Sequence, residues 1–527
     1  MGKSLVLNVV EWILHQIRVS DLVLALLGLF IFSSVHHRLT CRGPMIWPII
    51  GTMPSFLFHV NDLYGWTTSV LIKCGGTFRF RGLWMSGSFG IVTADPINIE
   101  YMLKINFKNF PKGQYYRERF HDLLGDGIFN SDNQLWKEQR RIATYAMFST
   151  KFADHSFNST ACLVHEKLLK LIKKLAHSGK SFDFQELLLR FTFDHICTAA
   201  FGVDPGCLGI DLPSVPFAKA FEDATEFTLN RFLVPPFLWK IMKFFNIGSE
   251  KQLRKALQII QDFAGKTVVD RQVESSKISM LNDRSDLLSR LINHNQDKRE
   301  LEHGNQFSDK FLKDFCISFI LAGRDTSSVA LTWFFWLIYK NPEVENRILY
   351  EIKQIISRRD SKNQRVLNNV SDIVFRREEL EEMIYLQAAL SESMRLYPPV
   401  PVDFKEAVED DIFPDGTMVK KKSRVLFSIF AMARMEGIWG KDCLDFKPER
   451  WIKEGRFVSE NQFKYVVFNA GPRVCLGKKF AYMQMKMVAA SIILRYKVVV
   501  GHGHHVAPKV TTTLYMKNGL LVTFNPR

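Results

Sequence analysis

The segment FNAGPRVCLG, residues 468–477, says more about this chain than any other ten residues. It places one cysteine, Cys475, shortly before a helical pattern that runs over residues 478–495. Gly471 can adopt a positive φ, and Gly477 leaves room for a flat ligand to approach closely. The segment therefore predicts a sulfur held on a tight loop at the start of a helix.

Three features of this loop favour a ligating thiolate at Cys475. The N-terminus of a helix carries partial positive charge, so we expect the pKa of the thiol to be lowered. Arg473 can pair with an anionic substituent of a ligand, and Phe468 can shield the sulfur from water. A lone buried cysteine is more often an inert core residue, so the interpretation needs support from elsewhere in the chain.

Composition narrows the class of protein. The chain has 527 residues, a net charge of +16, 47% hydrophobic residues and 44 phenylalanines, which indicates an aromatic core or a lipophilic cavity. The charge suits an anionic membrane surface or an acidic protein partner, and it also fits a plain solvated surface. No nucleic-acid-binding motif is present, so nucleic acid is not expected as a partner. None of the eight cysteines forms a C-x-x-C pair, which favours a reduced, cytosol-facing domain.

The N-terminal region predicts a membrane anchor. Residues 22–35 carry no charge, and residues 5–17 are also largely apolar. No small-residue cleavage site follows, so we expect a retained signal anchor over residues 1–40. Closely spaced prolines predict a stiff hinge over residues 41–55, followed by one domain over residues 56–527.

Helical patterns fill most of the chain before the cysteine loop. The longest runs over Phe311–Tyr339, with Ser308 as a suitable N-cap and Asn341-Pro342 as a stop. Charges within it disfavour a membrane span, so we expect a buried central helix.

The rest of the chain predicts smaller elements. Short β patterns occur near residues 77–92 and from residue 498 onward, and the polar stretch 275–306 predicts a surface loop. The expected fold class is mainly α with a minor β component.

Three further motifs carry polar residues at defined spacing. The central helix contains A-G-R-D-T at residues 322–326, where a glycine costs about 1 kcal/mol relative to alanine and so needs a reason. Glu392 and Arg395 share one helix face, as do Trp136 and Arg140. Taken alone, each motif also fits an ordinary cap or surface pair.

Together with the cysteine loop, these motifs resemble those of the cytochrome P450 family, whose heme loop reads F-x-x-G-x-R-x-C-x-G. The resemblance implies that family's fold, with heme b bound through Cys475 as the proximal thiolate ligand of the iron. It implies catalytic roles for Thr326, whose hydroxyl would bond bound O₂, and for Asp325, which would pass protons inward. A widened helix turn at Ala322 and Gly323 would make room for O₂.

The resemblance also implies supporting and heme-contacting residues. Glu392, Arg395 and Arg450 would form a buried network beneath the heme loop. The residues expected at the heme are Trp136, Arg140, Ala322, Gly323, Lys405, Phe468, Gly471, Arg473, Cys475 and Gly477. Where some animal relatives carry a glutamate that esterifies heme, this chain has Ala322, so we expect non-covalent heme.

Partners and location follow from the same resemblance. Nothing in the chain resembles a flavin or nicotinamide domain, so electrons are expected from NADPH through a separate cytochrome P450 reductase. We expect that reductase to dock near Cys475, with Lys478 and Lys479 among its contacts. The expected location is the endoplasmic reticulum membrane, with membrane lipid around the anchor and the catalytic domain facing the cytosol.

Stretches such as GDGIFNSDNQLWKEQRR and FILAGRDTSSVALTWFFWL are similar to the plant fatty-acid ω-hydroxylases. The nearest branch acts on very-long-chain fatty acids for suberin and cutin monomers. A terminal methyl C–H bond is stronger than its methylene neighbours, so a narrow apolar channel would have to select the chain end by position. The residues expected to line that channel are Phe120, Leu123, Phe129, Phe315, Phe319, Val400, Val402 and Leu514.

Three alternatives stay open at this point. The chain could hydroxylate another lipid, such as an alkane or a mid-chain position. It could instead be a peroxide-rearranging member of the family that needs neither O₂ nor a reductase, although Thr326 and Asp325 argue against this. A non-catalytic heme or lipid carrier is disfavoured by the complete set of motifs.

Overall fold

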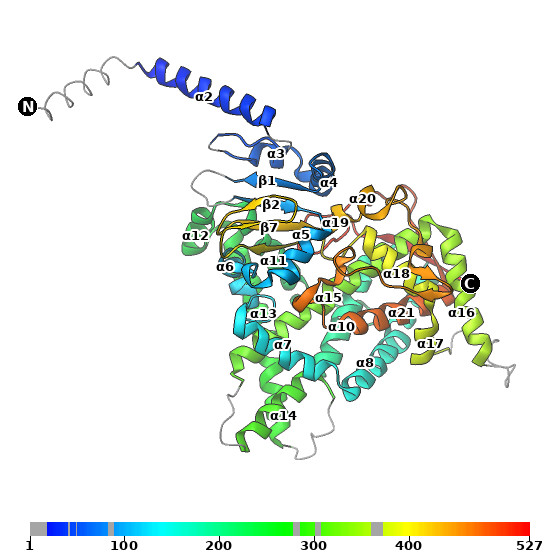
Figure 1. The fold of residues 1–527 in the computed structure, drawn as a ribbon. Coiled ribbons are helices and arrows are strands. Elements are labelled where there is room, and N and C mark those ends of the chain that lie inside the picture. Colours follow the sequence, from blue (N-terminus) through cyan, green and yellow to red (C-terminus); the bar gives the residue numbers. More distant parts are fainter. Residues whose placement is uncertain are drawn as a thin grey trace, which may run out of the picture.

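Helices build most of the molecule, and strands form a smaller part beside them (Figure 1). The computed structural model describes residues 18–40, 43–48, 50–82, 89–277, 285–300, 307–359 and 373–527. The expected class, mainly α with a minor β component, is confirmed.

The described helices are α2 (Val19–Thr40), α3 (Met53–Phe58), α4 (Leu63–Lys73), α5 (Pro96–Glu100), α6 (Gly113–Leu124), α7 (Asn133–Met147), α8 (Thr150–Cys162), α9 (Leu169–Ser178), α10 (Phe184–Phe201), α11 (Pro216–Leu233), α12 (Pro236–Phe245), α13 (Gly248–Lys277), α14 (Leu287–Glu300), α15 (Asp309–Lys340), α16 (Pro342–Arg359), α17 (Arg377–Glu382), α18 (Ile384–Leu396), α19 (Ile429–Met432), α20 (Glu436–Trp439) and α21 (Lys478–Arg495). Short helical turns used below are η2 (Tyr101–Ile105), η8 (Pro448–Trp451), η9 (Val466–Phe468) and η10 (Gly471–Arg473).

The strands form two sheets and two hairpins. They are β1 (Thr77–Arg81), β2 (Phe89–Thr93), β3 (Phe182–Asp183), β4 (Val402–Glu406), β5 (Asp411–Ile412), β6 (Met418–Val419), β7 (Arg424–Ser428), β8 (Ile452–Lys453), β9 (Arg456–Phe457), β10 (Tyr496–Val500) and β11 (Leu521–Pro526). The larger sheet has the order β1-β2-β7-β4 and contains one parallel pair, β2 with β7. The smaller sheet has the order β10-β11-β3, so both predicted β regions are confirmed.

The long apolar pattern forms the central helix α15, as predicted. The Ser308 hydroxyl accepts a hydrogen bond of 3.2 Å from the backbone N–H of Phe311, and the helix ends where Pro342 follows Asn341. Most of its side chains are buried, because α10, α18 and α21 pack against it at the centre of the molecule (Figure 1). This placement excludes a membrane-spanning role for α15 and makes it the core of the domain.

The prediction of a surface loop over residues 275–306 is wrong where the structure describes it. Helix α14 covers residues 287–300, and Leu287, Leu288, Leu291 and Ile292 are buried. These apolar residues recur at helical spacing, a signal that the surrounding polar residues obscured.

The N-terminal region is a helix that projects from the body. Helix α2 leads away from the sheet, and Leu24, Leu29 and Phe32 each expose more than half of their surface (Figure 1). No helix among the described residues has the length and apolarity of a membrane crossing. Part of the predicted anchor, residues 1–17, lies outside the described residues. Within residues 41–55, the predicted stiff hinge, the Thr52 N–H donates to the Arg81 carbonyl at 2.6 Å.

Candidate functional site

The cysteine loop is a tight turn between η9 and α21, as its glycines predicted. The Cys475 N–H donates to the Phe468 carbonyl at 2.7 Å, and the Val474 N–H donates to the Gly471 carbonyl at 3.1 Å. Gly471 has φ +61°, and a Cβ there would lie 2.2 Å from the Leu103 carbonyl oxygen in η2. Only glycine satisfies both the conformation and the close approach.

The environment of the sulfur differs from the expected one. The Cys475 side chain can be reached by solvent, but many protein atoms surround its sulfur. The resulting desolvation of the thiolate raises the pKa of the thiol. The Gly477 N–H, Arg140 and Lys478 act in the opposite direction but do not reverse the shift. The prediction of a lowered pKa is therefore wrong for the protein alone, because desolvation outweighs the helix N-terminus. A coordinated metal ion would favour the thiolate form by its own charge.

Helix α7 holds the loop through the predicted pair. The Arg140 guanidinium donates to the Val474 carbonyl at 2.7 Å, one residue before the cysteine. Trp136 is buried, and the Arg473 guanidinium lies 4.4 Å from the centre of its ring. Both predicted α7 residues therefore contact the cysteine loop, and neither is a plain surface residue.

Beside the loop lies a buried charged cluster that includes the predicted Lys405. The Lys405 ammonium lies 3.5 Å from the Asp403 carboxylate, and the Lys112 ammonium lies 2.6 Å from it. Burial lowers the pKa of Lys405 to about 7 against the opposing effect of Asp403. Burial alone would raise the pKa of Asp403, but Lys112 and Lys405 lower it well below its ordinary value. The Arg473 guanidinium bonds the Asp132 carboxylate at 2.7 Å, and its Nε atom has no partner among the described residues.

Three members of this cluster were missed by sequence reasoning. Lys112, Asp132 and Asp403 carry no motif, and Lys112 and Asp403 are 291 residues apart in the chain. Asn469, inside the loop, was also missed; its positive φ of 57° and its 3.2 Å bond to Asp403 link the loop to strand β4. The only available signal was that asparagine tolerates a left-handed conformation better than other non-glycine residues.

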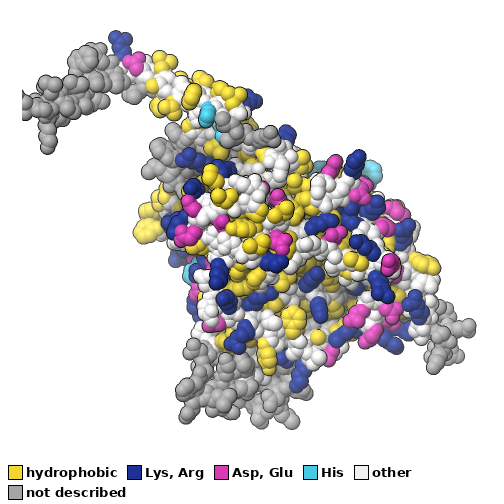
Figure 2. Space-filling view, in the orientation of Figure 1, with side chains coloured by type: hydrophobic (Ala, Val, Ile, Leu, Met, Phe, Trp, Pro, Cys, Tyr) yellow, Lys and Arg dark blue, Asp and Glu magenta, His cyan; other side chains and the backbone are white. Residues whose placement is uncertain are grey.

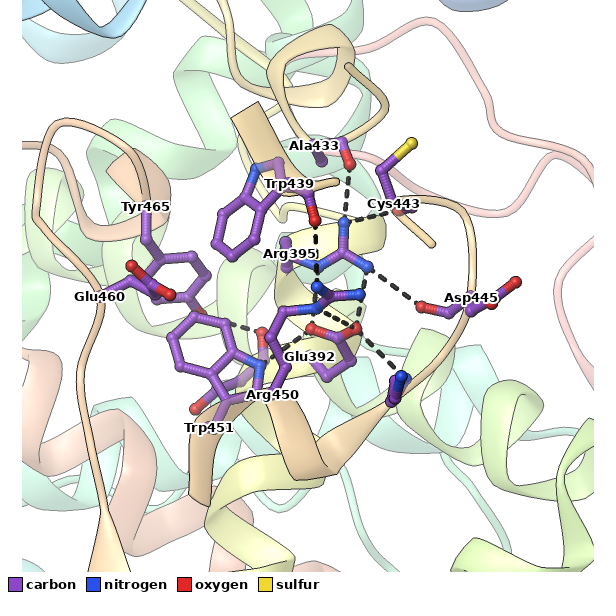
Figure 3. Close-up of polar contacts among 12 residues, drawn as sticks. Glu392, Arg395, Ala433, Trp439, Cys443, Asp445, Arg450, Trp451, Glu460 and Tyr465 are labelled. Atoms are coloured by element: carbon purple, nitrogen blue, oxygen red, sulfur yellow. Dashed lines mark hydrogen bonds and ion pairs between the residues drawn. The ribbon is translucent and has the colours of Figure 1, made fainter. Parts of the chain in front are cut away.

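The predicted Glu392–Arg395–Arg450 network is present and buried (Figure 3). Two guanidinium nitrogens of Arg395 donate to the two Glu392 oxygens at 2.8 Å, while Arg450 reaches the same carboxylate at 3.3 Å. The Trp451 indole N–H also donates to Glu392, at 2.8 Å.

The network is tied to the segment that precedes the cysteine loop. Arg395 donates to the Ala433 and Cys443 carbonyls at 2.6 and 2.7 Å. The Trp451 ring lies 4.6 Å from Tyr465, which directly precedes η9. The network thus joins α18 to the chain that enters the loop (Figure 3).

The A-G-R-D-T motif lies within an unbroken stretch of α15. The Thr326 hydroxyl donates to the Ala322 carbonyl, four residues earlier, at 2.6 Å. Bonds of this kind often bend a helix, and the widened turn stays a prediction. Packing between helices also requires glycine at position 323, because a Cβ there would lie 2.6 Å from the Ile196 side chain on α10. The glycine therefore permits close packing of the two central helices.

Asp325 is fully buried and paired with its neighbour. The Arg324 guanidinium lies 2.7 Å from one Asp325 oxygen, and the Tyr515 hydroxyl interacts with the same carboxylate. Burial raises the pKa of Asp325, although Arg324 opposes the shift. The carboxylate is thus less open to water than the sequence suggested.

All but one of the predicted channel residues lie in or beside one of two apolar clusters. Phe120 and Leu123 on α6 are buried in the same apolar cluster as Phe315 and Phe319 on α15. The Phe315 and Phe319 rings are stacked, with their centres 4.2 Å apart. Leu514 and Val402 belong to a different cluster around Trp333, and Val400 is half-buried beside Pro399, whose carbonyl bonds the Leu514 N–H. Phe129 joins neither cluster and exposes 37% of its surface. The Asn130 amide holds that turn by donating to the Gly125 carbonyl at 2.7 Å.

Comparison with known proteins gives independent evidence on the family of this chain. The family model described as Cytochrome P450 matches residues 42–524. The chain is 49% identical over 514 residues to cytochrome P450 86B1 of Arabidopsis thaliana, covering 97% of this chain and 90% of that protein. It is 42% identical over 468 residues to cytochrome P450 94A1 of Vicia sativa, covering 86% and 85%. It is 38% identical over 480 residues to the alkane hydroxylase MAH1 of Arabidopsis thaliana, covering 90% and 92%.

Proposed function

The chain belongs to the cytochrome P450 family, and we propose that it hydroxylates the terminal carbon of long-chain and very-long-chain fatty acids. The observation that carries this proposal is the buried aromatic cluster formed by α6 and α15. Its α15 members are on the same helix as Thr326. An apolar environment of this kind suits an alkyl chain, and a position on a rigid helix suits selection of one carbon.

The residues around Cys475 fit heme. A Cβ at Gly477 would fill space 3.8 Å from the sulfur, which suits a flat group bound next to it. Two heme propionates would find Lys405 and Arg473, the latter with a buried donor that has no partner among the described residues. Heme iron bound by a cysteine thiolate supplies the activation of O₂, from which one oxygen atom enters the substrate and the other leaves as water.

The described residues supply positioning and protons. The Thr326 hydroxyl can exchange its bond to Ala322 for one to O₂, since a hydroxyl both donates and accepts. Asp325 interacts with the Tyr515 hydroxyl as well as with Arg324, and it can take a proton from water and release it toward Thr326. For that step its carboxylate has to turn away from Arg324.

Electrons are supplied by a reductase, as in the family as a whole. We propose that an NADPH-dependent reductase docks on the face where Lys137, Arg141 and Lys479 are exposed near the cysteine loop. Lys478 is a weaker candidate than the sequence suggested, because its ammonium lies 5.4 Å from the Phe468 ring, against the loop itself.

Membrane association is proposed for the edge that carries α2. Hydrophobic side chains gather along α2 and at α12 (Figure 2), where Phe237, Phe244 and Phe245 each expose more than 60% of their surface. Such patches are rare on the surface of a soluble protein and bind lipid readily. We propose the endoplasmic reticulum membrane as the location, with the catalytic domain facing the cytosol, and keep residues 1–40, 41–55 and 56–527 as anchor, hinge and domain.

Turnover with NADPH, a reductase and fatty acids of increasing chain length tests the proposal. We expect ω-hydroxy acids as the main products, with the highest kcat/KM for long chains. Products hydroxylated at ω-1 or mid-chain positions would overturn the assignment. The same assay with alkanes tests a second candidate, which is favoured by the similarity to a protein named alkane hydroxylase.

A further inference from the structure

Arg119 on α6 is a buried cation that forms no ion pair with a carboxylate among the described residues. Its side chain is 1% exposed. Nε donates to the Arg231 carbonyl at 3.0 Å, and Nη1 donates to the Tyr115 carbonyl at 2.9 Å. The remaining nitrogen, Nη2, is buried without a hydrogen-bond partner in the described part of the chain. Within the described residues, this guanidinium therefore lacks both an ion-pair partner and one of its hydrogen bonds.

The adjacent Arg231 is a buried guanidinium whose charge is neutralised by carboxylates. It is equally buried, but its guanidinium bonds Glu250 at 2.6 Å and Asp122 at 2.7 Å. The acidic residue next to Arg119 in the sequence, Glu118, pairs with Lys240 at 2.5 Å. The carboxylates near Arg119 are therefore engaged by other cations.

A second guanidinium strengthens the positive field at this point. Arg119 and Arg424 both lie against the Tyr115 ring, at 3.3 and 3.9 Å from its centre. Burial lowers the pKa of Arg119 to about 10, with Arg424 and Arg231 acting in the same direction and Tyr115 and Glu118 opposing them, so the group stays charged at neutral pH. Burying a charge without a partner is costly, so the geometry favours an anion that binds here.

The site adjoins the apolar cluster proposed to hold the alkyl chain. The Arg119 guanidinium lies 5.4 Å from the centre of the Phe232 ring at the end of α11, and Phe232 lies 5.6 Å from Phe120. Phe120 shares its buried cluster with Phe315 and Phe319 of α15. Apolar contacts thus lead from the helix of Thr326 to an unpaired cation, and α6 and α11 lie next to each other in Figure 1.

We propose that Arg119 binds the carboxylate of the fatty-acid substrate, with Nη2 as a donor. The inference rests on the proposed function and extends it, because it names the residue that holds the end opposite to the reacting carbon. A carboxylate fixed at Arg119 would set the distance at which the methyl end reaches Thr326. An alkane lacks that group and would gain nothing from this site, so Arg119 also separates the two candidate substrates.

Spectral titration of heme-loaded protein tests the proposal without turnover. A long-chain fatty acid and its methyl ester are each titrated against wild-type protein and against Arg119→Gln, and binding is read from the substrate-induced shift of the heme spectrum. We expect Arg119→Gln to weaken binding of the acid about 10- to 100-fold, the effect of losing a charge-assisted hydrogen bond. Binding of the ester should change by less than about twofold, because the ester carries no charge to pair.

Two further variants control for structural damage. Arg117→Gln changes an arginine on the opposite side of α6, whose Nε bonds the Asn130 carbonyl, and should leave binding of both ligands intact. Arg119→Lys keeps the charge and serves if the glutamine variant does not fold; it should weaken binding of the acid alone. Equal losses for acid and ester would identify Arg119 as a structural link between α6 and α11 and overturn the inference. Wild-type protein that binds no fatty acid would overturn the proposed function as well, whereas acid binding that Arg119 variants leave unchanged would overturn only this inference.

Discussion

Replacing Gly471 with alanine tests how the cysteine loop is held in place. The residue has φ +61°, a conformation that costs an L-residue about 1–2 kcal/mol. The added Cβ would also lie 2.2 Å from the Leu103 carbonyl oxygen, and because the backbone fixes the position of both atoms, η2 and the loop have to move apart. Overpacking of this kind costs about 1–3 kcal/mol. We therefore expect Gly471→Ala to lower the free energy of unfolding by about 2–5 kcal/mol.

Gly455→Ala is the matched control for this variant. Gly455 in the β8–β9 turn has a similar φ of +72°, but a Cβ there would meet no atom within 4 Å. Only the conformational cost of about 1–2 kcal/mol applies to it. Denaturant unfolding measures both losses, and the reduced, CO-bound heme spectrum reports whether the sulfur still reaches the iron. Equal losses in the two variants, with an intact spectrum in both, would refute the argument that contact with η2 positions Cys475.

Three further predictions follow from other parts of the structure. Glu392→Gln leaves Arg395 buried without its counter-charge and should cost about 3–5 kcal/mol of stability in denaturant unfolding; a loss below 1 kcal/mol would contradict the proposed support of the loop. Burial lowers the pKa of His195 from 6.5 to about 3, so the folded state excludes a proton that the unfolded chain binds. Stability should therefore fall by about 2 kcal/mol as the pH drops from about 6.5 to 4.5, and His195→Asn should remove this part of the pH dependence. Lys479→Glu should slow reductase-supported turnover, most strongly at low salt, while Lys173→Glu on the exposed face of α9 should not, and equal effects would remove the proposed docking face.

The sequence predicted the elements whose signals are local. The apolar run after Ser308 and the proline after Asn341 determine both ends of α15. The tight turn at Gly471 could be predicted because glycine readily adopts a positive φ. The Glu392–Arg395 pair could be located because residues three apart on a helix share a face.

Other features depend on contacts between distant segments. Lys112 and Asp403 meet only after α6 packs against β4, so no sequence spacing predicts their ion pair. The requirement for glycine at position 323 also comes from Ile196 on another helix, a contact that no local pattern shows. The pKa of Cys475 was judged from the helix N-terminus alone, and desolvation, which depends on the whole fold, has the larger effect.

The reduced, CO-bound heme spectrum of cysteine variants tests the central claim most directly. Cys475 and Cys162 are the two exposed cysteines in the described part of the chain, so Cys162→Ser is the matched control for Cys475→Ser. Wild-type protein and Cys162→Ser should show the red-shifted Soret band of thiolate-bound heme, and folded Cys475→Ser should lack it. A band that persists in Cys475→Ser would show that another residue holds the iron.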